Sequence, residues 1–131
     1  MDYNKSDNTY ETKRQVIDLD NVVSAGSVLQ RRINLIPVDS IAGFYVRPGF
    51  YEISGATVIP GGVSFTISSL NATYCELLLY HRREKEPFAV LPFPEKYKIG
   101  NCYSMIVFQV DIENLEYAYR MDGPYDPSKG L

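Results

Sequence analysis

The sequence predicts an all-β fold, an immunoglobulin-like antiparallel β-sandwich of about six to eight short strands. From residue 41 onward, short runs with strand periodicity are separated by turns rich in Gly, Pro and Asn. These turn signals recur about every eight to twelve residues, as they do in sandwiches. The 131 residues suit one domain with a sizeable core, and 45% of them are hydrophobic.

An N-terminal extension, residues 1–45, is predicted to precede a sandwich that occupies residues 46–131. The first 15 residues are polar and charged, and no periodicity in them could bury a face, so they are expected to be disordered or weakly held. Residues 15–38 fit either a short helix or an extended chain. Asn21 could cap the helix, whereas Gly26 would weaken it by about 1 kcal/mol relative to alanine. The residues at helical spacing are Val22, Gly26, Leu29 and Ile33.

Beyond residue 40, each predicted strand ends at a turn. In the clearest strand, 63–68, Val, Phe and Ile alternate with Ser, Thr and Ser, which predicts one buried face and one hydroxyl-rich outer face. The run 88–93 is flanked by prolines, which lack the amide hydrogen that a sheet ladder needs, so it suits an edge strand or a crossing from strand to loop. The last run, 117–122, alternates Tyr and Met with Ala, Arg and Asp until Gly123-Pro124 ends it. The other predicted strands are residues 41–46, 74–80 and 101–110, and residues 55–62 are predicted to be a tight connection.

The composition excludes several classes of partner. The net charge is −3 and the basic pairs are short and scattered, so no nucleic acid partner is expected. No window approaches the roughly twenty apolar residues of a membrane span and no secretion signal is present, so we expect a cytoplasmic protein without a membrane partner. Cys75 and Cys102 are predicted to be small buried hydrophobes rather than a disulfide. The sequence has neither zinc-ligand spacing nor a phosphate loop, and no metal or cofactor is expected.

Residues of the kind that carry catalysis occur, but not in catalytic patterns. His81 lies in a charged loop without an identifiable nucleophile or orienting carboxylate, so we expect it to be solvated. Carboxylate pairs that hydrolyse glycosides come from separate elements that face a cleft. The close pairs Asp111/Glu113 and Asp122/Asp126 are therefore interpreted as solvated turn residues. No catalytic residue is predicted.

Aromatic residues are abundant, with eleven Tyr and six Phe. Exposed aromatic rings can stack on the apolar face of a sugar while polar neighbours bond its hydroxyls. Aromatic residues of a β-sandwich are first of all packing residues, however, and this is the interpretation for most of them. Tyr80, Tyr97 and Tyr103 are the candidate glycan-binding rings, because they flank the charged loop or the proline-rich stretch that follows it.

A set of motifs in the second half of the chain resembles a known domain. In order and spacing, they resemble the N-terminal domain of glycogen debranching enzymes and isoamylases, which are α-1,6-glucan hydrolases of the α-amylase superfamily. That domain is the family-48 carbohydrate-binding module, an early-set immunoglobulin-like sandwich that precedes a catalytic (β/α)8 barrel. The resemblance covers about residues 46 to 131. The motifs are Pro48-Gly49, Gly55-Ala-Thr57, Gly61-Gly-Val-Ser-Phe65, Ala72-Thr73, Glu76-Leu-Leu-Leu-Tyr80, Glu86-Pro87, Tyr117-Ala-Tyr-Arg120 and Gly123-Pro-Tyr-Asp126.

The resemblance implies a non-catalytic domain, cut from a longer chain, that packs against the barrel of the same parent. Gly123, Pro124 and Tyr125 would then lead into the barrel. Arg120 would either pair with a carboxylate inside the sandwich, which we favour because an unpaired buried charge is costly, or point at the barrel.

Glycan-binding members of this module class typically use exposed tryptophans, which this chain lacks, so docking is favoured over direct binding of α-glucan such as glycogen. A glycan-binding module with tyrosine platforms and an unrelated interaction sandwich are the alternatives. A docking face without its barrel could also pair with a second copy of the chain as a homodimer.

Overall fold

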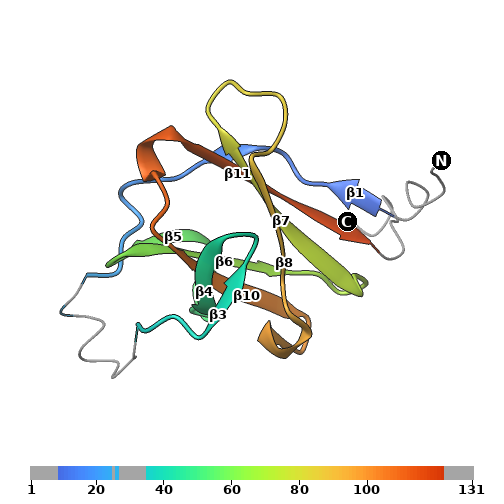
Figure 1. Ribbon diagram of the computed structural model, residues 1–131. Helices are drawn as coiled ribbons and strands as arrows, with labels where there is room; N and C mark the ends of the chain where they lie inside the picture. Colours follow the sequence, from blue (N-terminus) through green and yellow to red (C-terminus); the bar gives the residue numbers. More distant parts are fainter. Residues whose placement is uncertain (1–8, 25, 27–34, 123–131) are drawn as a thin grey trace.

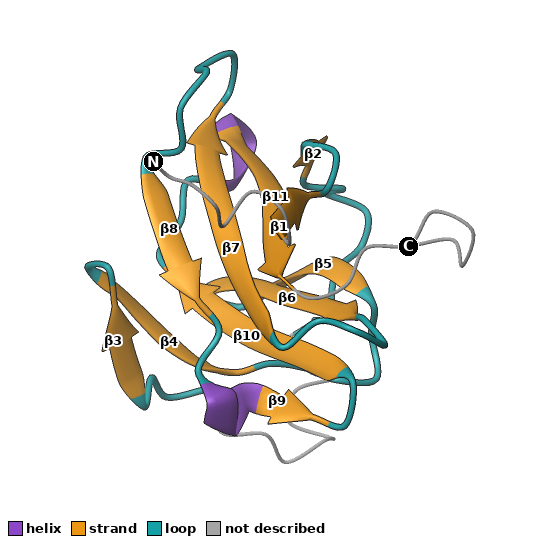
Figure 2. Cartoon of the chain, turned by 90° about the vertical axis from the view of Figure 1, so that its right-hand side faces the viewer, coloured by secondary structure: helices purple, strands orange, loops and turns teal. Residues whose placement is uncertain are grey.

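The computed structural model describes residues 9–24, 26 and 35–122. In this part of the chain two antiparallel sheets lie one over the other as a β-sandwich, which confirms the predicted fold class (Figures 1 and 2). The sheets contain five and six strands, more than the six to eight expected, because β1, β2 and β9 are pieces of only two or three residues.

The first sheet, sheet A, is built around the last strand of the described chain. Its order is β1-β11-β7-β8, and β2 also pairs with β11. The edge position of β8 confirms the expectation from its flanking prolines. The strands are β1 (Thr9–Glu11), β2 (Gln15–Val16), β7 (Tyr74–His81), β8 (Ala89–Pro92) and β11 (Leu115–Asp122).

The second sheet, sheet B, has β10 near its centre. Its order is β3-β4-β10-β6-β5, and β9 pairs with β10. Two 3-10 helices, η2 (Glu95–Tyr97) and η3 (Ile112–Asn114), lie in the connections before β9 and β11. The strands are β3 (Asp39–Ile41), β4 (Phe44–Pro48), β5 (Gly55–Ile59), β6 (Gly62–Ser68), β9 (Lys98–Ile99) and β10 (Cys102–Phe108).

The main core lies between the two sheets, where the alternation of β6 and β11 places their apolar side chains. The rings of Phe65 and Tyr117 join the sheets in an edge-to-face contact with centroids 5.2 Å apart. Tyr119 and Met121 are buried on the same face of β11 as Tyr117, as the sequence pattern predicts. Cys75 is buried in this core, as expected, whereas Cys102 was expected to be buried but is partly exposed; both are free thiols.

Sheet B carries a second, smaller core on its outer face. The serine and threonine side chains on this face of β6 are therefore buried, contrary to the expectation from the sequence. Ser64 and Thr66 were expected to face solvent but are only 1% and 3% exposed. The backbone of Phe50 crosses over them, since its N–H donates to Ser64 Oγ (3.0 Å) and its carbonyl accepts from Thr66 Oγ1 (3.1 Å). Thr66 Oγ1 also bonds Ser104 Oγ at 2.6 Å. The hydroxyl face therefore anchors a loop instead of facing water.

Two predicted turns and strands also differ from the structure. The run 41–46 is two strands, because Ala42 and Gly43 (φ 52° and 85°) form a two-residue hairpin turn between β3 and β4. The predicted connection 55–62 is largely strand β5, and its turn consists of Pro60 and Gly61 alone.

The N-terminal extension is also more structured than expected. Thr9–Glu11 and Gln15–Val16 pair with β11, so residues 9–16 belong to sheet A instead of being disordered. Asn21 does not cap a helix. Its side-chain amide donates to the Ala56 carbonyl at 2.8 Å, and the Val22 backbone bridges to Val58 of β5. Of the residues considered for the helix, Leu29 and Ile33 lie outside the described part of the chain.

Candidate functional site

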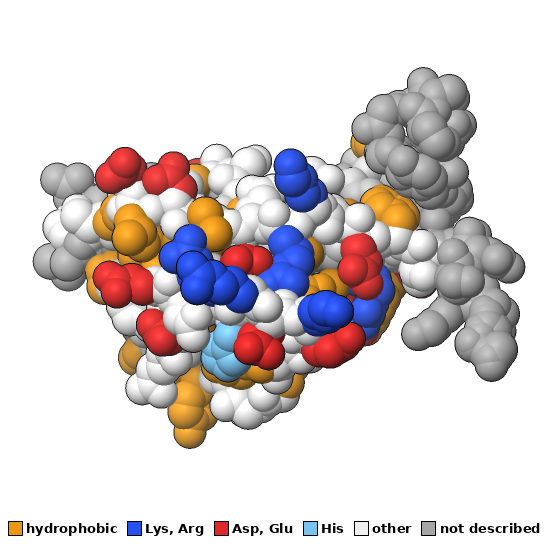
Figure 3. Space-filling view, turned by 90° about the horizontal axis from the view of Figure 1, so that it is seen from above, with side chains coloured by type: hydrophobic (Ala, Val, Ile, Leu, Met, Phe, Trp, Pro, Cys, Tyr) orange, Lys and Arg blue, Asp and Glu red, His pale blue; other side chains and the backbone are white. Residues whose placement is uncertain are grey.

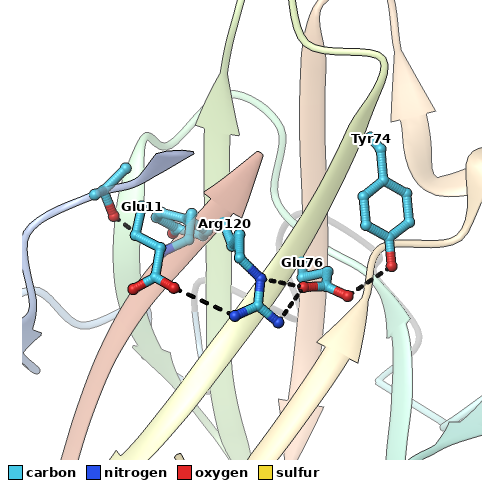
Figure 4. Close-up of polar contacts among 6 residues, drawn as sticks. Glu11, Tyr74, Glu76 and Arg120 are labelled. Atoms are coloured by element: carbon cyan, nitrogen blue, oxygen red, sulfur yellow. Dashed lines mark hydrogen bonds and ion pairs between the residues drawn. The ribbon is translucent and has the colours of Figure 1, made fainter. Parts of the chain in front are cut away.

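A row of polar side chains crosses the outer face of sheet A near the end of β11 (Figure 4). The strand register places Glu11 of β1, Arg120 of β11 and Glu76 of β7 side by side. Arg120 donates to Glu76 Oε1 from Nε (2.8 Å) and lies 2.7 Å from it through Nη2, while Nη1 lies 3.2 Å from Glu11 Oε2. Tyr74 extends the row, since its hydroxyl donates to Glu76 Oε2 at 2.8 Å. The row therefore ties three strands together.

The charges of this row are mutually compensated. Burial alone would lower the pKa of Arg120, but the bonds to Glu76 and Glu11 outweigh it and raise that pKa. Burial, followed by the bond to the Glu76 carboxylate, raises the pKa of Tyr74 to about 12.

Over the upper surface of the molecule as Figure 1 orients it, acidic and basic side chains are interspersed (Figure 3). No field of a single sign arises there that would attract a charged ligand.

A second contact of the N-terminal segment covers Tyr80, one of the three candidate rings. The Arg14 guanidinium lies 3.8 Å from the ring centroid of Tyr80, in cation–π geometry. Arg14 also pairs with Glu116 at 2.7 Å and donates to the Glu84 carbonyl at 2.6 Å. The Tyr80 side chain is only 5% exposed, so its ring offers no open face to a sugar.

The other two candidate rings are buried more deeply. Tyr97 and Tyr103 are each 1% exposed. The Tyr97 hydroxyl donates to Asp39 Oδ2 at 2.6 Å, and the Tyr103 hydroxyl donates to the Ala72 carbonyl at 3.3 Å. Burial in each case raises the pKa of the phenol, for Tyr103 to about 12. The structure therefore gives all three rings packing roles, which was the interpretation for most aromatic residues, and none of them is a surface platform.

Comparison with known protein families decides what kind of domain this is. Residues 54–131 match the carbohydrate-binding module 48 family, described as the isoamylase N-terminal domain. The chain belongs to this family. The match covers the sandwich from just before β5 through β11, and the motifs that carried the resemblance fall inside it except for Pro48-Gly49. A comparison with curated proteins found no match.

In this family-48 module, Arg120 pairs with carboxylates, as favoured, but on the outer face of sheet A and not inside the sandwich. Its side chain is 34% exposed and that of Glu76 is 16% exposed. The pairing accounts for the charge of Arg120 without a barrel. Gly123, Pro124 and Tyr125 lie outside the described residues, so their role as a linker stays a prediction.

His81, the only histidine, is exposed, as expected from the sequence. Its ring stacks on Phe88 with centroids 4.1 Å apart and planes 12° apart. Asn114 lies 3.5 Å from its Nδ1.

Among the described residues, no group of three His, Cys, Asp or Glu side chains could hold a metal ion. No helix in that part of the chain is long and apolar enough to cross a membrane.

Sequence reasoning missed one surface feature, a shallow hollow of about 490 Å³ beside the β3–β4 hairpin. Tyr45, 58% exposed, forms one side of it and lies opposite Ser40 in the strand register. The run 41–46 was interpreted as a single strand, which hid the outward position of Tyr45. The sequence signal was the Ala-Gly pair at the hairpin turn, since a two-residue turn brings flanking side chains onto the same face. The hollow is lined by Pro37, Val38, Asp39, Ser40 and Tyr45.

Proposed function

We propose that this chain is the non-catalytic accessory domain of an α-1,6-glucan hydrolase, a glycogen-debranching type of enzyme, and that it packs against and positions the catalytic barrel of its parent chain. The observation that carries the proposal is the match of residues 54–131 to the isoamylase N-terminal domain family. Family-48 modules bind or accompany carbohydrate chemistry without performing it. The glycoside hydrolase activity therefore belongs to the parent, which we expect to be cytoplasmic.

An exposed apolar surface beside β11 supports docking. Val16 and Leu19 are 49% and 54% exposed and border a hollow of about 420 Å³. Its other lining residues are Ile17, Ile112 and Leu115, together with the charged Arg82 and Glu113. Apolar surface that a monomer leaves open often marks a lost partner. β2 pairs with Glu116 and Tyr117, so this surface lies at the start of β11, at the end of the strand away from Asp122.

The test needs the coding sequence beyond residue 131. We expect it to encode a (β/α)8 barrel with acidic catalytic residues, and we would express the two segments as separate polypeptides. Mixing them should restore debranching activity on glycogen and give a complex in size-exclusion chromatography. A Val16→Asp/Leu19→Asp chain should fold but no longer form the complex, whereas Leu70→Asp, at a 75% exposed site, should behave as the wild type. A following segment without a barrel would refute the proposal.

A further inference from the structure

Residues 9–16, which we call the strap, cover the outer edge of β11. They pair with it in two short stretches, of three residue pairs through β1 and two through β2. Between these stretches the Thr12 N–H donates to the Tyr119 carbonyl at 2.8 Å, and the Tyr119 N–H donates to Thr12 Oγ1 at 2.9 Å. Among the described strands, only β1 and β2 pair with this edge, because β7 lies on the other side of β11. The strap therefore occupies the place where an edge strand accepts an extended peptide by strand addition.

One extra residue in the strap decides which of its side chains reach the outer face of sheet A. Four residue steps separate Glu11 from Gln15, but only three separate their partners on β11, Arg120 and Tyr117. An extra residue of this kind is a β-bulge, and it reverses the alternation of the side chains that follow it. A regular strand would point Glu11 and Arg14 to opposite faces, because they are three residues apart. The bulge places both on the outer face.

On this face, three groups enclose the guanidinium of Arg14. Its central carbon lies 3.8 Å from the ring centroid of Tyr80. Nη2 lies 2.7 Å from Glu116 Oε1, and Nη1 donates to the Glu84 carbonyl at 2.6 Å. The three groups belong to β7, to β11 and to the loop after β7, so the pocket is not part of the strap. An aromatic ring, a carboxylate and a carbonyl together favour a guanidinium, because they combine cation–π, ion-pair and hydrogen-bond contacts.

The charges along β11 also fix the direction of the strand that pairs with it. Towards the end of β11, Arg120 lies 3.2 Å from the Glu11 carboxylate of the strap (Figure 4). Towards its start, Glu116 pairs with Arg14. An antiparallel segment with an acidic residue three positions before an arginine therefore matches both charges. The reverse order would bring like charges together at both positions.

The strap is held more weakly than the strands of the core. None of its eight side chains is buried, and four of them are exposed. Arg14 Nε is shielded from solvent but has no acceptor among the described residues, so the strap satisfies its own pocket incompletely. The first core side chain of this segment is Ile17, 6% exposed, which directly follows the strap. Segments with few buried apolar contacts open locally at a lower cost than core strands.

We propose that the edge of β11 under the strap is a binding site for an extended protein segment, and that the strap occupies this site as an internal competitor. The pocket formed by Tyr80, Glu116 and the Glu84 carbonyl takes an arginine of that segment. The ligand class is an extended peptide that pairs antiparallel to β11 and has an acidic residue three positions before the arginine. Because the strap belongs to the same chain, its effective concentration at the site is on the order of millimolar, and an external segment must displace it. The proposal depends neither on a catalytic barrel nor on a carbohydrate.

The experiment measures the fluorescence anisotropy of a labelled peptide as the 131-residue chain is added. The peptide has the sequence of residues 9–17, Thr-Tyr-Glu-Thr-Lys-Arg-Gln-Val-Ile, with both ends blocked to remove the terminal charges. It should bind weakly to the wild type and at least about tenfold more tightly to Arg14→Ala, which keeps the pocket but lacks the internal arginine. Lys13→Ala removes the neighbouring exposed charge of the strap and is the matched control, which should bind the peptide as the wild type does.

Changes in the peptide and in the pocket test the arginine contact itself. On the Arg14→Ala chain, a peptide with alanine in place of its arginine should bind roughly tenfold more weakly. A peptide in which the glutamate and the arginine are exchanged should bind more weakly still, because both charges then meet like charges. Adding Glu116→Gln to the Arg14→Ala chain should also weaken binding of the unmodified peptide, since the carboxylate of the pocket is lost.

Thermal unfolding of each variant verifies that it folds. If Arg14→Ala does not fold, Arg14→Gln takes its place with the same expectation, because it keeps part of the stem over Tyr80 without the charge. Equal affinity of the peptide for the wild type and the Arg14 variant would overturn the proposal. So would equal affinity of the arginine and alanine peptides, or the lack of saturable binding to the Arg14 variant. None of these results bears on the accessory role, which is tested separately by complex formation with the barrel.

Discussion

Replacing Arg120 distinguishes a structural role for this residue from a docking role. We expect Arg120→Met to lower the free energy of unfolding of the isolated chain by about 2 kcal/mol. Methionine keeps most of the apolar stem and removes the charge and its hydrogen bonds. Glu76 would then be left with a 16% exposed carboxylate and no cation beside it.

The magnitude follows from the exposure of the pair. A fully exposed ion pair contributes about 0–1 kcal/mol, and breaking a buried one costs about 3–5 kcal/mol. The Arg120–Glu76 contact, with side chains 34% and 16% exposed and bonds of 2.7 and 2.8 Å, lies between these limits. The contact with Glu11 is weaker, because Glu11 is 49% exposed and 3.2 Å away. Glu11→Gln should therefore cost no more than about 0.5 kcal/mol.

Urea unfolding of the wild type, Arg120→Met, Glu76→Gln and the double variant completes a thermodynamic cycle. We expect a coupling energy of about 1–2 kcal/mol between the two positions, because they share the bonds that each single change removes. An Arg120→Met chain within about 0.3 kcal/mol of the wild type would refute the structural role. It would then favour the alternative in which Arg120 acts on the barrel.

Three further changes test the outer face of sheet B and the polar row. Gly49→Ala should destabilise the chain by about 1–3 kcal/mol in urea, because its Cβ would lie 2.8 Å from Ser64 Oγ and 2.9 Å from the Met105 amide nitrogen. Ser64→Ala should cost about 1–3 kcal/mol and speed hydrogen exchange at Phe50, whose N–H would lose the bond to Ser64 Oγ. The folded pKa of Tyr74 is raised from 10.0 to about 12, so the unfolded state loses this proton first. Stability should fall between about pH 10 and 12, and Tyr74→Phe should make the fall shallower.

Each of these changes has a control or a contradicting outcome. Ser68→Ala alters an exposed serine on the same strand as Ser64 and should stay within about 0.5 kcal/mol of the wild type. A Gly49→Ala chain with wild-type stability would mean that the backbone at this position does not pack on β10. Equal slopes of stability against pH for the wild type and Tyr74→Phe would show that Tyr74 titrates alike in both states.

The outer faces of the sheets show where sequence prediction failed. In β6, the alternation of Val, Phe and Ile with Ser, Thr and Ser correctly identified a strand and its inner face. It could not reveal that Phe50, fourteen residues before Ser64, folds back over the hydroxyls. The same applies to Tyr80, whose covering residue, Arg14, comes from a segment with no periodicity of its own. Exposure depends on which distant segment covers a face, and no local pattern encodes that.

The sequence alone was sufficient for the class of fold, the principal strands and the family, because strand periodicity, turn residues and motif spacing are local properties of the chain. It also showed which side chains of β11 enter the core. The partners of Arg120, the pairing of residues 9–16 with β11 and the open position of Tyr45 were decided only by the tertiary structure. Each of these depends on strand register between segments far apart in the sequence, and register is set by how the two sheets pack.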